Sequence, residues 1–131
     1  TLARYLGLDF SNADDRKKLR ASTFTINDLI ARARSGDTAA VAAIQRSGHY
    51  LGIGLSIIIN GLNPGRVYVG GEMAQAWDLI EPEVTKIIKE RALTAGAART
   101  PVIPEPGSEH PRLRGATALV VAPLFAAPQI A

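Results

Sequence analysis

The sequence predicts an α/β domain that is rich in helices and holds about two short parallel strands. Apolar residues recur in steps of three or four between residues 38 and 62, which is the period of a helix. A short segment at 66–69 that is rich in strand-forming residues stands between a Pro-Gly pair and a Gly-Gly pair. Val102-Ile103 stands between two prolines, so only a very short or edge strand fits there. We therefore expect four to five helices around two strands, in a single domain covering residues 1–131.

The composition is that of a globular protein. The chain has 131 residues, of which 47% are hydrophobic and 21% charged, enough to form a core and too apolar for disorder. It has no cysteine, which excludes disulfides, thiolate zinc sites and cysteine nucleophiles and fits a cytoplasmic protein. The formal charge of +3 is too small to indicate nucleic-acid binding. The longest apolar run, 51–59, is far shorter than the ~20 residues of a membrane span.

Two features lead us to expect a piece of a longer polypeptide. The chain begins with Thr1 rather than Met, without a signal-peptide pattern. Two short strands are also too few for a stable sheet. We expect further strands of that sheet to lie outside this sequence.

The first third of the chain predicts two short helices separated by a polar segment. Residues 2–8 have a short helical pattern, whereas residues 9–20 are polar and predict a loop or a frayed turn. Thr25 followed by Asp28 is a capping-box pattern. We expect a helix over 26–34, ended by Ser35-Gly36.

A long helix is predicted to follow, with Asp37 as its N-cap. At about 25 residues it would be ~37 Å long, and its second half is apolar on nearly every side, so it should be covered on several sides. Gly48, Gly52 and Gly54 each cost up to ~1 kcal/mol of helix propensity. Close approach by another helix or by a partner subunit would explain them, and so would simple tolerance in a buried helix. Pro64 ends the helix, because α conformation is disfavoured before proline.

The rest of the chain predicts helices around the two strands. Residues 72–79 begin helical, and Glu81-Pro82 should restart or kink the helix, because Pro suits a first turn. An apolar stripe, lying opposite polar positions, predicts a surface helix packed on the strands, ended by Gly96. Residues 112–126 predict a last helix. The stripe consists of Val84, Ile87, Ile88 and Ala92.

Few residues offer chemistry. His49 and His110 are far apart and have no second ligand at metal spacing, so we predict no metal site. Asp14-Asp15, beside three basic residues, is interpreted as a solvated turn. No catalytic motif is recognisable, and we predict no catalytic residue. The suggestive pair is Gly70-Gly71, because glycines between a strand and a helix let backbone N–H groups approach an anion. A tight turn also needs glycines without any ligand.

The segment from Leu51 to Met73, LGIGLSIIINGLNPGRVYVGGEM, resembles the C-terminal half of ROK-family proteins (repressors, open reading frames and sugar kinases). In that family a helix ending in Asn-Pro leads into an apolar strand and a Gly-Gly pair, as residues 63–71 do here. The tail RLRGATALVVAPLFA, residues 112–126, is similar to the family's last helix. The resemblance covers roughly residues 28–125.

The resemblance implies that the chain is part of an actin-like, ribonuclease-H-like ATPase lobe. The family's phosphate-binding turn, catalytic aspartate, sugar contacts and cysteine-rich zinc motif lie upstream and have no counterpart here. Gly70 and Gly71 match the pair that lies near the nucleotide in kinase members. The family also implies a homo-oligomer, commonly a homodimer, because its members pair through this lobe, and the glycine-marked helix 48–62 is a candidate interface.

Two functions follow from the resemblance. The first is the C-terminal effector and oligomerisation portion of a sugar-responsive transcriptional regulator, without cofactors in this chain. Such a protein binds DNA through an N-terminal domain, and its sugar mainly through residues outside this chain. The alternative is the C-terminal lobe of a glucokinase-like sugar kinase, with ATP and Mg²⁺ as cofactors and Gly70 and Gly71 contacting the nucleotide. The arginine-flanked last helix and the Pro-rich tail 122–131 favour the regulator. We expect no catalysis by this chain itself.

Overall fold

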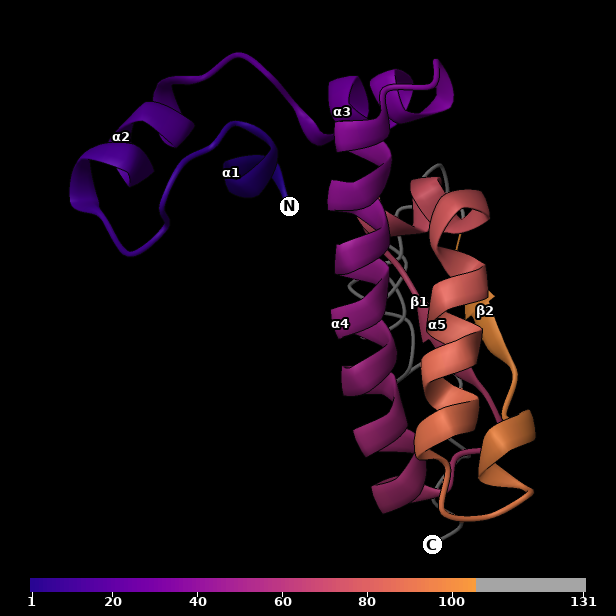
Figure 1. The fold of residues 1–131 in the computed structure, drawn as a ribbon. Coiled ribbons are helices and arrows are strands. Elements are labelled where there is room, and N and C mark those ends of the chain that lie inside the picture. Colours follow the sequence, from indigo (N-terminus) through magenta and orange to yellow (C-terminus); the bar gives the residue numbers. More distant parts are fainter. Residues whose placement is uncertain (106–131) are drawn as a thin grey trace, which may run out of the picture.

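The computed structural model describes residues 1–105 of the chain. This part contains five α-helices, two 3₁₀-helices and a two-stranded parallel sheet (Figure 1). The predicted fold class is thereby confirmed, including the parallel pairing of the strands. The predicted helix at 112–126 lies outside the described residues. In chain order the elements are α1 (Leu2–Tyr5), α2 (Ala13–Ala21), α3 (Ile26–Arg34), α4 (Thr38–Leu62), β1 (Val67–Val69), η1 (Glu72–Ala76), α5 (Trp77–Arg91), η2 (Ala97–Arg99) and β2 (Val102–Pro104).

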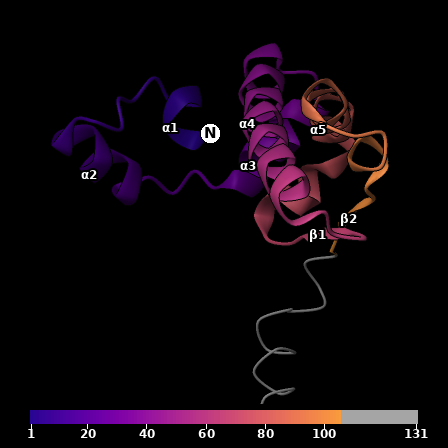
Figure 2. The ribbon, with the colours of Figure 1, turned by 90° about the horizontal axis from the view of Figure 1, so that it is seen from below.

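The polar segment at 9–20, predicted as a loop, contains most of helix α2, so that prediction is wrong. The side chain of Asn12 caps the helix by accepting the N–H of Asp14 at 2.9 Å. Acidic residues in its first turn and basic residues in its last suit the helix dipole. No residue of α2 is buried, so the helix lacks the apolar period that reveals a helix in a sequence. It projects away from α3, α4 and α5 (Figures 1 and 2).

Helix α3 begins with the predicted capping box. Thr25 Oγ1 accepts the N–H of Asp28 at 3.2 Å, and Asp28 Oδ2 accepts the N–H of Thr25 at 2.7 Å. The box satisfies two backbone donors that the first turn leaves unpaired. The apolar face of α3 then packs into the core with α4 and α5. The largest fully buried side chains of this core are Leu29, Ile44, Ile59, Ile80 and Val84.

Helix α4 has the 25 residues predicted for it and runs the length of the helical body (Figure 1). Asp37 caps it as expected, accepting the N–H groups of Ala39 and Ala40. The chain leaves the helix through Asn63 in the left-handed conformation, with φ at 43°. Proline at 64 disfavours α conformation for the residue before it, and asparagine tolerates the left-handed region better than most residues.

Helices α4 and α5 lie close together because α4 presents glycines to its neighbour. A Cβ atom added to Gly48 would lie 2.8 Å from Cβ of Ile80, and one added to Gly52 would lie 2.9 Å from Cβ of Ile87. A Cβ on Gly54 would meet nothing within 4 Å. Close approach within the described residues therefore accounts for two of the three glycines, while Gly54 faces open space.

Helix α5 differs from its prediction at both ends. A 3₁₀-helix, η1, precedes it, and Pro82 lies inside one continuous helix rather than restarting it. The helix ends at Arg91 and not at Gly96. The side chain of Asn60 in α4 binds this end, donating to the carbonyl of Arg91 at 2.9 Å and accepting the N–H of Leu93 at 3.0 Å. These two bonds satisfy backbone groups that have no partner within the helix at its end.

The sheet is small and lies against one side of the helices (Figure 2). Val67 pairs with Val102, and Val69, which is buried, pairs with Pro104. Val67 donates its N–H to Pro101, and the carbonyl of Val69 accepts from Glu105. No helix among residues 1–105 is both long and apolar enough to span a bilayer.

Candidate functional site

The turn at Gly70-Gly71 follows the carboxyl end of β1 and leads into η1. Gly71 has φ at 89°, a region that side chains rarely adopt, so glycine is needed there on backbone grounds alone. An added Cβ would meet nothing within 4 Å, and both glycines are exposed. In open α/β sheets, ligands bind outside the carboxyl ends of the strands. The turn therefore lies at the end of the sheet where ligands bind in folds of this class.

The segment that follows the turn is acidic in sequence. Between Arg66 and Lys86 the sequence has no basic residue, whereas it has four acidic ones. The first of these, Glu72, lies exposed at the start of η1. A phosphate group would meet negative charge rather than a cation from this segment, and the helix that follows the turn is a single short 3₁₀-helix. Asp78 and Glu83 are paired, with Arg34 and His49 respectively, so the charge of Glu72, next to the turn, is the one that opposes a phosphate there. The acidic residues are Glu72, Asp78, Glu81 and Glu83.

Arg34, at the end of α3, holds the segment after the turn in place. Its Nη2 donates to the carbonyl of Gln75 at 2.8 Å and to Oδ1 of Asp78 at 2.9 Å. The hydrogen bond from Arg34 lowers the pKa of the Asp78 carboxyl. From the sequence, Arg34 resembles any solvated residue in a last helical turn, so its role was not predictable.

His49 pairs with a carboxylate rather than standing alone. Its Nδ1 lies 2.8 Å from Oε1 of Glu83, which joins α4 to α5. This hydrogen bond lowers the pKa of Glu83, and Lys86 adds to the effect. His110 lies outside the described residues. Among residues 1–105, no three His, Cys, Asp or Glu side chains gather as a metal would require.

The outer face of α4 carries exposed apolar side chains. Ile57 is 67% exposed, Leu62 is 77% exposed, and Tyr50 and Ile58 are also exposed. No charged residue interrupts the helix after Arg46. Exposed apolar patches of this kind are typical of interaction surfaces.

Comparison with known proteins identifies the family. The model of the ROK family matches residues 10–122. The chain belongs to the ROK family. Over 96 residues it is 32% identical to the DNA-binding transcriptional dual regulator NagC of Escherichia coli (strain K12), covering 73% of this chain and 23% of that protein. Over 77 residues it is 30% identical to the DNA-binding transcriptional repressor Mlc of the same strain, covering 59% of this chain and 19% of that protein.

A solved structure supports the same assignment. The crystal structure of a ROK family transcriptional regulator, described as a homologue of the E. coli MLC protein, aligns with a TM-score of 0.59 and 32% identity. The alignment covers 63% of this chain and 21% of that one. The ROK resemblance and the fold class are thus confirmed. The chain spans less than a quarter of the length of each of these relatives.

Proposed function

We propose that this chain is the C-terminal effector and oligomerisation portion of a sugar-responsive transcriptional regulator of the ROK family. The observation that carries the proposal is the 32% identity with a DNA-binding transcriptional regulator over 73% of the chain. A relative of equal identity from Shigella flexneri is named N-acetylglucosamine repressor, which makes an amino sugar the first effector to test. DNA would be bound through a domain outside this chain, and the sugar mainly by residues outside it, in the cytoplasm.

The packing of α4 against α5 suits an effector and oligomerisation portion of a regulator. Two glycines, an interhelical His49–Glu83 pair and the Asn60 bonds fix the two helices against each other. A rigid pair of this kind can transmit a movement from one of its ends to the other, because packed helices shift as units. The exposed face of α4, centred on Ile57, supports pairing with a second copy.

The experiment uses the longer polypeptide that contains this chain. We expect it to retard a DNA fragment from its own upstream region in a gel-shift assay, and N-acetylglucosamine or a related sugar to release it. Failure to bind any such fragment, together with sugar-dependent phosphate transfer from ATP, would overturn the regulator and favour the kinase.

The kinase remains the second candidate, because Gly70-Gly71 lies at the carboxyl end of β1, where a nucleotide would bind. The acidic stretch after it does not favour ATP. On the kinase hypothesis, calorimetry of the longer polypeptide with ATP and Mg²⁺ gives saturable heat, and Gly71→Val, which forces a β-branched residue into a positive φ, removes it. The 131-residue chain itself should show no sugar-dependent ATP hydrolysis.

A further inference from the structure

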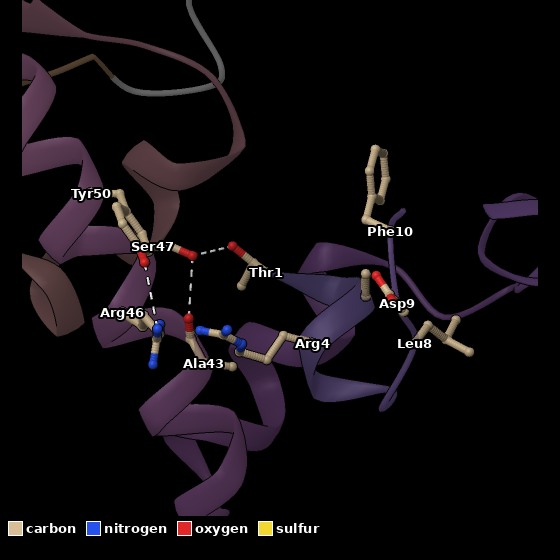
Figure 3. Close-up of a pocket in the computed structure, with 10 residues that line it drawn as sticks. Thr1, Arg4, Leu8, Asp9, Phe10, Ala43, Arg46, Ser47 and Tyr50 are labelled. Carbon is tan, nitrogen blue, oxygen red and sulfur yellow. Dashed lines mark hydrogen bonds between the residues drawn. The ribbon is translucent and has the colours of Figure 1, made fainter. Parts of the chain in front are cut away.

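One face of α4 forms the floor of a hollow beside the N-terminal segment. Residues 43, 46, 47 and 50 follow in helical steps, and α1 lies over them (Figure 3). The hollow has a volume of about 430 Å³, within the ~300–1,000 Å³ common for small-molecule pockets. The N-terminal segment contributes Arg4, Leu8, Asp9 and Phe10 to its wall. No sequence pattern indicates this hollow, because its two halves are about 40 residues apart in the chain.

The neighbouring Tyr5 fixes Arg4 at this place. The Tyr5 hydroxyl donates to Oδ2 of Asp37 at 2.7 Å and accepts from Nη1 of Arg32 at 2.9 Å. The Tyr5 ring stacks on Phe24 with 5.5 Å between centroids. These contacts hold α1 to the start of α4, so the exposed side chain of Arg4 begins from a backbone that is anchored beside α4.

Two guanidinium groups face the hollow without a carboxylate partner. Among residues 1–105, neither Arg4 nor Arg46 forms an ion pair. Figure 3 shows the two side chains converging from α1 and α4. Nη2 of Arg46 lies 3.5 Å from the hydroxyl of Tyr50, and Arg46, with a smaller effect from Arg4, lowers the pKa of Tyr50. Asp9, on the far wall, is engaged by the N–H and hydroxyl of Ser11.

We propose that this hollow binds a phosphate monoester, whose phosphate oxygens Arg4 and Arg46 hold while the Tyr50 hydroxyl donates a further hydrogen bond. Guanidinium groups stay charged and bind phosphate in paired hydrogen bonds. Donors that approach from two elements suit a tetrahedral anion with several acceptor oxygens better than a planar carboxylate. The volume leaves room for an organic group, and the apolar side chains of Leu8 and Phe10 line the wall beside it. The inference is independent of the regulator proposal.

Isothermal titration calorimetry of the 131-residue chain at constant ionic strength tests it. Phenyl phosphate is the probe, inorganic phosphate reports on the anion alone, and benzoate is the carboxylate of similar size. We expect one saturable site for phenyl phosphate, weakened about tenfold or more by Arg46→Gln and by Arg4→Gln. Arg99→Gln, which removes an exposed arginine on η2, is the matched control and should leave the Kd unchanged. Benzoate should bind at least about tenfold more weakly than phenyl phosphate.

Three results would overturn the inference. The first is the absence of saturable heat with phenyl phosphate. The second is an equal loss in Arg99→Gln, because binding would then reflect net charge alone. The third is benzoate binding as tightly as phenyl phosphate, since the site would then lack the preference for phosphate that its two guanidinium groups imply.

Discussion

Adding one methyl group to Gly52 tests the close packing of α4 against α5. In Gly52→Ala the new Cβ would lie 2.9 Å from Cβ and 3.1 Å from Cγ2 of Ile87, and 3.3 Å from the backbone Cα of Val84. Distances below about 3.0 Å are not tolerated, so one of the two helices must move. The nearest atoms are a branched Cβ and a backbone atom, which cannot move aside by rotating a flexible side chain.

The expected magnitude follows from two opposed terms. Alanine improves helix propensity over glycine by up to ~1 kcal/mol, while overpacking a core costs ~1–3 kcal/mol. The free energy of unfolding of Gly52→Ala should therefore be lower than that of the parent chain by ~0–2 kcal/mol. Gly54→Ala, on the same helix but facing open space, gains the propensity without the clash. The two variants should differ by ~1–3 kcal/mol.

Thermal and urea unfolding, followed by circular dichroism, measure the difference. In a domain of this size each kcal/mol moves the Tm by roughly 4 °C, so Gly54→Ala should melt well above Gly52→Ala. If the two variants melt together, or if Gly52→Ala is the more stable, then α4 and α5 do not meet at Gly52.

Three further variants probe the bonds that define the helix ends. Thr25→Ala should lower the unfolding free energy by about 1 kcal/mol through loss of the capping box, measured by urea unfolding against Thr23→Ala, which changes an exposed threonine outside the box. Asn60→Ala should cost ~1–2 kcal/mol, because it frees the carbonyl of Arg91 and the N–H of Leu93 at the end of α5, with Asn27→Ala as the control; an equal effect of the two would contradict this role. The hydrogen bond from Tyr5 lowers the pKa of Asp37 below its ordinary 3.8, so the stability that it contributes is present at neutral pH and is lost as the pH falls through the lowered pKa. Tyr5→Phe should therefore show a smaller loss of stability between neutral pH and about pH 3 than the parent chain, and an unchanged acid profile would refute the assignment.

The sequence predicted those elements whose apolar residues repeat. Helices α3 and α4 have long stripes and clear caps, at Thr25 and Asp37, and their bounds were predicted correctly. Helix α2 has no buried face, so its only signals were the Asn12 cap and the order of its charges. The end of α5 is set by a side chain from another helix, Asn60, and no pattern within 77–96 could reveal it.

The candidate sites also differ in whether a local sequence pattern predicts them. Gly70-Gly71 was visible because glycines between a strand and a helix form a local pattern, and the positive φ of Gly71 accords with it. Whether a nucleotide binds there stays a prediction. The pairing of His49 with Glu83 and the hollow between Arg4 and Arg46 each join residues more than 30 positions apart. Only folding brings them together, and no local pattern of either segment predicts such a contact.

The free edge of β1 and the exposed apolar face of α4 are two surfaces that a further element could cover. Val67 and Val69 direct their backbone groups to β2, so in the alternation of a parallel sheet the N–H and carbonyl of Tyr68 point to the opposite edge. That edge lies on the α4 side of the sheet (Figure 2). The exposed Ile57 is available either to a second copy of the chain or to a further strand of a longer polypeptide, because the matched part of this chain covers only 23% of the length of NagC.

The variant Ile57→Glu separates these two uses. If copies pair through α4, the parent chain should elute as a dimer in sizing chromatography with light scattering, and Ile57→Glu as a monomer. Leu93→Glu, which changes an exposed apolar side chain outside helix α4, should leave the dimer intact. If instead a strand of the longer polypeptide covers this face, Ile57→Glu should leave the mass of that polypeptide unchanged and lower its unfolding free energy by ~1–3 kcal/mol, as burial of an unpaired charge requires. A variant that changes neither mass nor stability would show that α4 keeps this face exposed to water.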